Sequence, residues 1–244
     1  MFPLSDDNPS ERTPFVTWAL IGACALVYLW EASLGQDGVE AAFYSFGMIP
    51  ARLFGYKALS PELAVVPAWT TVLTSMFMHG GLLHLGGNML FLWIFGDNVE
   101  DSLGHTRFLI FYLSCGIAAA LTQGFLSPDS TVPMIGASGA ISGILGAYLL
   151  LHPFATVRVL IFLGLFVTIT HVPAMLVLGL WFLIQLLSAA ATPLDQPGVA
   201  FWAHVGGFVC GMVFVNFFKR PEVPLFQPRR SNPFSVESTR RFWG

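Results

Sequence analysis

Six stretches of about 20 residues with almost no charged side chains constrain the fold of this chain more than any other feature. A helix of that length crosses the roughly 30 Å hydrocarbon layer of a bilayer. The composition agrees, because 55% of the 244 residues are hydrophobic and only 10% are charged, against roughly 25% in an average soluble domain. We therefore predict an all-α polytopic membrane protein with six transmembrane helices. The predicted spans are residues 15–34, 72–95, 108–126, 132–151, 173–191 and 199–218.

A seventh apolar segment, residues 159–170, lies between Arg158 and His171. It is about 12 residues long, which is too short to cross the hydrocarbon layer as a helix. A seventh full span would also move the C-terminal basic residues to the other side of the membrane. We expect this segment to be an interfacial or re-entrant piece.

Basic residues are distributed unequally between the two sides of the six-span arrangement. Lys and Arg near span ends favour the cytoplasmic side. Only Arg52 and Lys57 fall on the opposite side, so we predict that both termini are cytoplasmic. The basic residues on the predicted cytoplasmic side are Arg12, Arg107, Arg158, Lys219, Arg220, Arg229, Arg230, Arg240 and Arg241.

The segments outside the spans define the predicted domain organisation. Residues 1–14 form a short cytoplasmic N-terminus without the features of a cleaved signal or a transit peptide, which favours a bacterial inner (plasma) membrane. Residues 35–71 are too long and too apolar for a plain linker, so we expect a small outer loop subdomain within the membrane domain, residues 15–218. Residues 219–244 are rich in Pro, Ser and Arg and predict a disordered cytoplasmic tail.

Charge and cysteine usage argue against several classes of function. A net charge of -3 without a basic stripe disfavours nucleic-acid binding. Cys24, Cys115 and Cys210 are scattered in apolar runs and predict neither a disulfide framework nor a zinc site. No Asp, Glu, Lys or Arg lies well inside the five later spans, which disfavours an ion or proton pathway. We expect no metal and no cofactor, and the oligomeric state stays open.

Four polar residues lie at nearly one depth in three of the predicted spans. Polar groups inside a membrane cost free energy and so mark either helix packing or function. His84, Ser138 and His204 each precede the cytoplasmic end of their span by about 13 to 15 residues, which is about 20 Å at 1.5 Å per residue. Asn88 lies one turn deeper on the His84 face, because it is four residues further along. These residues predict one site, nearer the outer membrane surface.

Small residues surround the serine and one of the histidines. Ser138 lies in GASGAISGILGAY, and His204 lies in AHVGGFVCG, where Ala203, Gly207 and Gly211 recur every four residues. Small residues at this spacing let two membrane helices approach closely. We therefore predict that the fourth and sixth spans touch and that Ser138 contacts His204.

A serine and a histidine in contact can carry out nucleophilic catalysis. A neutral imidazole can take the serine proton and later return it to a leaving amine. Because no buried Asp or Glu is available, we expect a Ser138–His204 dyad whose histidine is oriented by packing. A tetrahedral intermediate also needs hydrogen-bond donors, and His84, the Asn88 amide and the Ser138 backbone N–H are suitable types.

The stretches HGGLLHLGGNMLFLWIFGDNVED, GASGAISGILGAY and AHVGGFVCG together resemble the rhomboid family of intramembrane serine proteases, over about residues 14–218. The resemblance implies a six-transmembrane-helix rhomboid-like bundle that cleaves transmembrane protein substrates in the lipid bilayer near its outer face. It implies Ser138 as nucleophile and His204 as base. By the same resemblance, His84 and Asn88 stabilise the oxyanion.

The remaining polar and aromatic residues receive structural assignments. Residues 192–198 look like the family's cap above the site. We expect His79 to be structural and Ser142 to serve packing. Three residues of the fifth span could either pack in the core or line a lateral entry for substrate, and we favour core packing. They are Trp181, Phe182 and Gln185.

Two other functions remain as alternatives to an intramembrane endopeptidase. A catalytically inactive rhomboid-like chaperone or adaptor predicts that the serine or the histidine is missing, whereas Ser138 and His204 are both present. A transporter predicts charged residues in the spans, broken helices and inverted repeats, and none of these is evident. The sequence therefore favours the endopeptidase.

Overall fold

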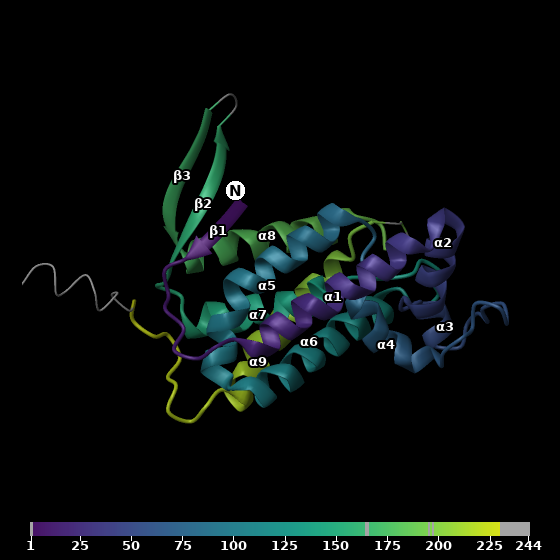
Figure 1. The fold of residues 1–244 in the computed structure, drawn as a ribbon, viewed down its shortest axis with the longest axis horizontal. Helices are drawn as coiled ribbons and strands as arrows, with labels where there is room; N and C mark the ends of the chain where they lie inside the picture. The colour runs from purple at the N-terminus through teal and green to yellow at the C-terminus, as the bar shows by residue number, and fades with distance from the viewer. Residues whose placement is uncertain (1, 164–165, 195, 197, 230–244) are drawn as a thin grey trace, which may run out of the picture.

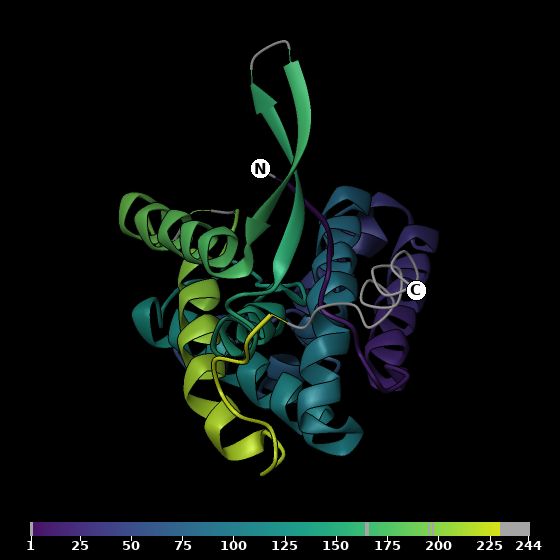
Figure 2. The same cartoon turned by 90° about the vertical axis from the view of Figure 1, so that its left-hand side faces the viewer.

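The chain is mainly helical in this computed structural model, which describes residues 2–163, 166–194, 196 and 198–229. The long helices run along the long axis of the molecule (Figure 1), and α7 packs against α5, α6, α8 and α9 in the middle of the bundle (Figure 2). The predicted helical membrane bundle is confirmed. Its helices are α1 (Phe15–Ser33), α5 (Leu82–Leu103), α6 (His105–Leu126), α7 (Ser138–Leu151), α8 (Ala174–Ala191) and α9 (Phe201–Phe218).

Among the described residues, four helices are long and apolar enough to cross a membrane: α1, α6, α8 and α9. The two other helices that correspond to predicted spans, α5 and α7, differ from them in composition or length. The helix α7 has 14 residues and is therefore only about 21 Å long. Its neighbours cover it, so it does not need the full length of a lipid-facing helix.

The central helix α7 begins at Ser138, later than the predicted start of its span at residue 132. The preceding residues are held without helical structure, since Met134 pairs with Met48 in an isolated bridge and the Gly136 N–H donates to Ser75 O at 2.8 Å. Non-helical backbone is tolerated at membrane depth where protein or water satisfies its polar groups. Ser138 is thereby placed at a helix N-terminus inside the bundle.

The helix α5 is displaced from the predicted span, residues 72–95, and covers Leu82–Leu103. The segment before it is irregular because it is anchored elsewhere: the buried carboxylate of Glu31 in α1 accepts the N–H of His79 at 3.2 and 3.3 Å. The residues just before His79 form only two short helices, α4 (Thr71–Thr74) and η2 (Ser75–Phe77).

A second buried carboxylate joins the end of α5 to the start of α1. Glu100 is 1% exposed and accepts the N–H groups of Val16 at 2.9 Å and Thr17 at 2.7 Å. His105 Nδ1 also lies 2.6 Å from a Glu100 oxygen. The first N–H groups of a helix lack intrahelical acceptors and form its positive end, so a carboxylate is stabilising there. Because Glu100 is stabilised in this way, α5 extends past residue 95, the predicted end of its span, to Leu103.

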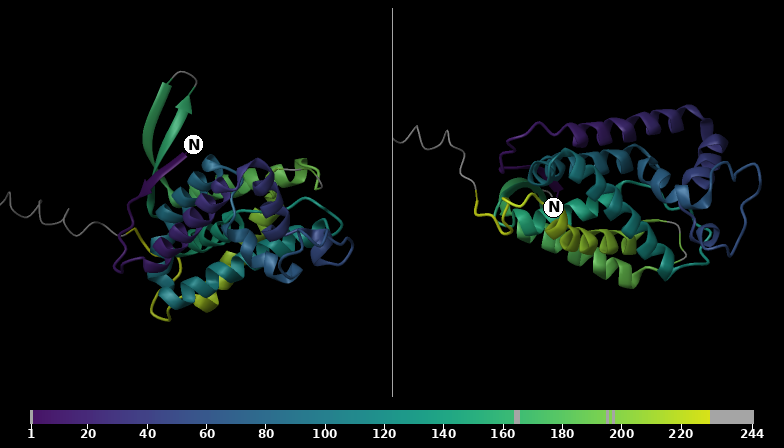
Figure 3. Two further views of the ribbon diagram at one scale, coloured as in Figure 1. Left: turned by 45° about the vertical axis from the view of Figure 1, so that its right-hand side comes forward. Right: turned by 90° about the horizontal axis from the view of Figure 1, so that it is seen from below.

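The loop predicted to form an outer subdomain, residues 35–71, contains helices at the end of the molecule opposite the sheet (Figures 1 and 3). Arg52 holds this region together by donating to Ser45 O at 3.3 Å and to Val66 O. The contact of residues 35–71 with the bilayer surface stays a prediction. The helices are α2 (Gly35–Phe46), α3 (Pro50–Leu53) and η1 (Ala68–Thr70).

A three-stranded antiparallel sheet, which the all-α prediction did not include, lies at the other end. Its strand order is β1-β2-β3, and β1 pairs with β2 through Asp6 and Val157. The segment expected to be interfacial or re-entrant, residues 159–170, belongs to the hairpin that projects from the bundle (Figure 2), although residues 164–165 lie outside the described part. The stretches TVRV and VTIT are rich in β-branched residues, and their apolar Val and Ile alternate with Thr or Arg, which explains the strands. The strands are β1 (Phe2–Asp6), β2 (Thr156–Leu163) and β3 (Phe166–Pro173).

The prediction of a disordered tail from residue 219 does not hold for residues 219–229. The Phe226 N–H donates to Leu150 O at 2.7 Å, and the Gln227 N–H donates to Leu151 O at 2.9 Å. These carbonyls belong to the last turn of α7, where no intrahelical donor is available. Residues 230–244 lie outside the described part of the chain.

The backbones of helices α7 and α9 lie in direct contact at glycine residues. A Cβ atom on Gly207 would overlap the carbonyl of Gly139, and one on Gly211 would overlap the carbonyl of Gly143. The predicted approach of these two helices through small residues is confirmed. It places the N-terminus of α7 beside the first turn of α9.

The Gly207→Ala variant tests this packing. We expect a destabilisation of about 1–3 kcal/mol, because the added methyl group meets backbone that cannot rotate away. The matched control is Gly179→Ala on α8, where a Cβ would meet nothing within 4 Å. Thermal unfolding in detergent measures both variants, and equal stability of the two would contradict the packing account.

Burial of Asp6 makes the docking of β1 sensitive to pH. Burial raises the pKa of this carboxyl from 3.8 to about 7, against the opposing effect of a hydrogen bond from the Tyr148 hydroxyl, and the nearby Asp97 and Asp7 raise it further. The Asp6 carboxyl binds its proton more tightly when β1 is paired with β2 than when β1 is detached. The resulting stabilisation of the paired state is complete below pH 3.8 and is lost as the pH rises through about 7. We expect backbone amides of β1 to exchange faster at about pH 8 than at about pH 5 after correction for intrinsic rates. Asp6→Asn should remove the difference in exchange between the two pH values. If exchange in the Asp6→Asn variant depends on pH as strongly as in the parent, Asp6 is not the cause.

Candidate active site

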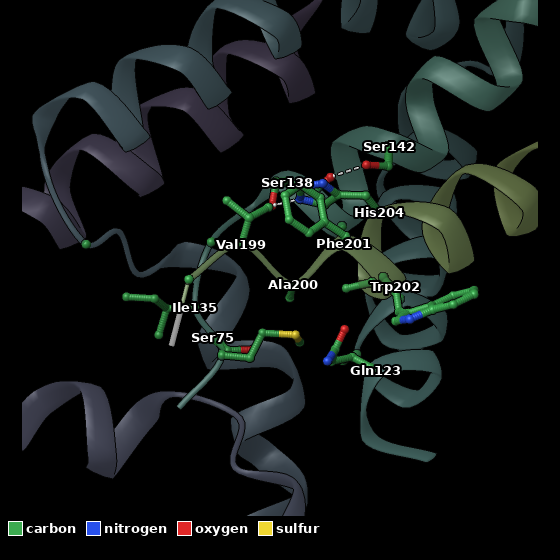
Figure 4. Close-up of a pocket in the computed structure, with 18 of the residues that line it drawn as sticks. Ser75, Gln123, Ile135, Ser138, Ser142, Val199, Ala200, Phe201, Trp202 and His204 are labelled. Carbon is green, nitrogen blue, oxygen red and sulfur yellow. Dashed lines mark hydrogen bonds between the residues drawn. The ribbon is translucent and has the colours of Figure 1, made fainter. Parts of the chain in front are cut away.

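A pocket of about 980 Å³ lies among α5, α7, α8 and α9, and the four residues predicted from depth all line it. Figure 4 shows the pocket with Ser138 and His204 facing each other. Of the predicted cap, residues 192–194, 196 and 198 line the pocket, and residues 195 and 197 lie outside the described part. The four predicted residues are His84, Asn88, Ser138 and His204.

The predicted contact between serine and histidine is present. Ser138 is the first residue of α7, and its Oγ atom lies 2.8 Å from His204 Nε2. His204 is 9% exposed and belongs to the first turns of α9. At this distance the imidazole can accept the proton of the hydroxyl.

A hydrogen bond, and not packing alone, orients the imidazole of His204. Its Nδ1 atom lies 2.8 Å from Oε1 of Gln185 on α8. The assignment of Gln185 to core packing is therefore wrong, because the sequence does not show which face of α8 meets α9. Trp181 also lines the pocket, 6.0 Å from the His204 ring, whereas Phe182 stacks on Phe208 with centroids 4.5 Å apart.

His84 and Asn88 converge on the backbone just before the serine. The Gly80 N–H donates to His84 Nδ1 at 3.3 Å, which leaves the hydrogen on Nε2. The Asn88 Nδ2 atom is buried and has no hydrogen-bond partner among the described residues. Gly136 has φ of +120°, and a Cβ there would lie 2.8 Å from His84 Nε2. Two N–H donors are thus held beside the segment that leads to Ser138.

The remaining candidates make contacts within the fold. His79 Nδ1 lies 3.1 Å from Phe77 O, and its ring meets that of His84 at 5.2 Å. Ser142 donates to Ser138 O at 2.6 Å, one turn earlier on the same helix. Within the described residues, no group of three or more His, Cys, Asp or Glu side chains is arranged to hold a metal ion.

Comparison with known families supplies an independent observation. The Rhomboid domain model matches residues 67–221, which is more than half of the chain. The chain belongs to the rhomboid family. Membership in this family, together with the apolar helices of the bundle, makes it a multi-pass integral membrane protein.

Named rhomboid relatives come from bacteria and mitochondria. Rhomboid protease GluP of Bacillus subtilis (strain 168) is 32% identical over 215 residues, which cover 82% of this chain and 39% of that protein. Rhomboid protein 1, mitochondrial, of Saccharomyces cerevisiae is 29% identical over 185 residues, which cover 72% and 50%. Presenilin-associated rhomboid-like protein, mitochondrial, of Homo sapiens is 30% identical over 155 residues, which cover 60% and 37%. The chain therefore spans half or less of the length of these relatives.

Proposed function

We propose that this rhomboid is an intramembrane serine endopeptidase that cleaves transmembrane segments of other membrane proteins. The observation that carries the proposal is the 2.8 Å contact between His204 Nε2 and Ser138 Oγ in a pocket that also holds two N–H donors. Inclusion of a relative named rhomboid protease in the same family supports this chemistry. We propose Ser138 as nucleophile and His204 as general base and acid.

In the first half of the reaction, His204 Nε2 takes the proton from Ser138 as Oγ bonds to the scissile carbonyl carbon. The tetrahedral intermediate then collapses, the C–N bond breaks, and the imidazolium gives its proton to the leaving amine. In the second half, the imidazole takes a proton from water while the water oxygen attacks the acyl-enzyme. The C–O bond to Ser138 breaks, and its oxygen recovers the proton from Nε2.

The charge on the carbonyl oxygen needs donors that are in place before the reaction. We assign this role to His84 Nε2–H and to the Asn88 amide, whose Nδ2 atom is buried without a partner among the described residues. The Ser138 N–H is a third candidate, because it lies in the first turn of α7, where no intrahelical acceptor exists. A substrate oxygen would satisfy donors that the resting protein leaves available.

The substrate must present an accessible carbonyl at this depth. In a regular helix each carbonyl already accepts a hydrogen bond from the fourth residue beyond it. We therefore propose substrates whose membrane helix is weakened near the outer surface by glycine or another poor helix former. Such a segment can unwind into the pocket beside α5 and α8.

The same proposal includes a placement in a bacterial inner membrane, with the sheet end of the bundle and both termini in the cytoplasm. Among the described residues, Arg52 and Lys57 lie at the α2–α3 end, while the other basic residues lie toward the sheet end. This asymmetry favours a cytoplasmic sheet end. The hairpin of β2 and β3 would then lie at the cytoplasmic surface of the bilayer.

The first test is cleavage of a single-span model substrate in liposomes by the parent and by Ser138→Ala and His204→Ala. Each variant should lose at least about 10⁴-fold in kcat, because nucleophile and base act as a unit. Controls are Ser114→Ala on α6 and His171→Ala on β3, which lie outside the pocket. Cleavage by Ser138→Ala at the parental rate would refute the mechanism.

The second test addresses the oxyanion donors through Asn88→Ala. We expect kcat to fall about 10²- to 10³-fold with little change in KM, since the amide acts on charge that develops only in the transition state. The matched control is Asn216→Ala, which removes an exposed amide that donates to carbonyls of its own helix α9. An Asn88→Ala variant that cleaves as fast as Asn216→Ala would remove Asn88 from the assigned role.

A further inference from the structure

Gln185 lies on the opposite side of His204 from Ser138. It belongs to α8, is 9% exposed, and places Oε1 at 2.8 Å from His204 Nδ1. The other ring nitrogen, Nε2, lies 2.8 Å from Ser138 Oγ. The three side chains therefore form one hydrogen-bonded series that connects α8, α9 and α7.

The contact with Gln185 selects one form of the neutral imidazole. An amide oxygen only accepts hydrogen bonds, so it favours the tautomer in which Nδ1 of His204 carries the proton. In that tautomer the lone pair of Nε2 points at the hydroxyl of Ser138, as a general base requires. The alternative tautomer carries the hydrogen on Nε2 and would donate to Ser138 instead of accepting from it.

Ring contacts hold the imidazole but do not distinguish its nitrogens. Trp181 lies one turn before Gln185 on the same face of α8, with its ring centroid 6.0 Å from that of His204. Phe201 meets the imidazole edge-on at 6.3 Å. These rings limit tilting of His204, so the selection of a tautomer falls to the hydrogen bond with Gln185.

A neutral acceptor also suits the surroundings of His204. A buried carboxylate costs free energy unless a positive partner compensates it. Among the described residues that line the pocket, none is Lys or Arg. The amide of Gln185 supplies an acceptor without introducing a charge that the resting site could not neutralise.

We propose that Gln185 is a positioning residue that acts through His204 by holding the tautomer with hydrogen on Nδ1. This role rests on the proposed protease function and adds a third member to the pair of Ser138 and His204. Gln185 does not touch the reacting atoms, so its loss should slow the chemical step and leave substrate binding unchanged.

Nitrogen NMR of the protein labelled with ¹⁵N-histidine tests the tautomer without requiring activity. The His204 signal, assigned by its absence in His204→Ala, should show a protonated Nδ1 and an unprotonated Nε2 at a pH at which the ring is neutral. Gln185→Leu should lose this preference, because leucine offers no acceptor to Nδ1. A parent with hydrogen on Nε2, or an unchanged tautomer in a folded Gln185→Leu variant, would overturn the proposal.

Kinetics with the single-span substrate supply the second readout. In Gln185→Leu we expect kcat to fall about 10- to 100-fold, less than the roughly 10⁴-fold loss known for replacing a triad carboxylate. KM should stay within about twofold, because Gln185 acts on the chemical step and not on substrate binding. The control is Leu187→Ala, which truncates a 61% exposed side chain on the same helix. A parental kcat in a folded Gln185→Leu variant would contradict the role.

These two readouts separate the inference from the function on which it rests. If Ser138→Ala still cleaves, the protease mechanism fails, while the NMR spectra still report whether Gln185 sets the tautomer. If Ser138→Ala is inactive and Gln185→Leu is unaffected in both readouts, only the role of Gln185 fails. Thermal unfolding identifies a variant that does not fold. In that case the NMR spectrum of the parent tests the proposal, because it shows whether Nδ1 or Nε2 of His204 carries the hydrogen.

Discussion

The close backbone contact between α7 and α9 is the constraint on which the site depends. A side chain on Gly207 or Gly211 would meet a carbonyl of α7, so the two helices approach only because these positions lack a Cβ. That approach brings the first residue of α7 within 2.8 Å of the His204 imidazole. A packing interaction between small residues thus sets the geometry of a polar contact inside the bundle.

The polar groups of the pocket are mostly neutral, which is consistent with the cost of charge in a membrane. In the proposed mechanism, the imidazolium and the oxyanion appear together, so each charge forms near its counter-charge. The Asn88 amide, which has no partner in the part of the chain that the structure describes, and the proposed acceptor Gln185 lie on different helices, α5 and α8. The site therefore needs the bundle to be assembled before any of its donors and acceptors is correctly placed.

Sequence patterns predict the bundle and the contact between Ser138 and His204, because helical rise and spacing determine depth along an axis. The family is predicted from the resemblance of three motifs and not from this geometry. Sequence patterns do not predict the partner of Gln185, since the rotation of α8 about its axis depends on packing such as Phe182 against Phe208. Hydropathy also misplaces α5, because the buried Glu100 is stabilised by the start of α1, far away in the sequence. The pairing of β1 with β2 is likewise a long-range contact.

Covalent labelling of the proposed nucleophile, Ser138, tests the central claim most directly. The parent and His204→Ala proteins, both in liposomes, are treated with a fluorophosphonate, which reacts with activated serine hydroxyls, and tandem mass spectrometry locates the adduct. The account predicts a single adduct on Ser138 of the parent and none in His204→Ala. An adduct on another serine of the parent, or equal labelling of Ser138 without the histidine, would contradict it.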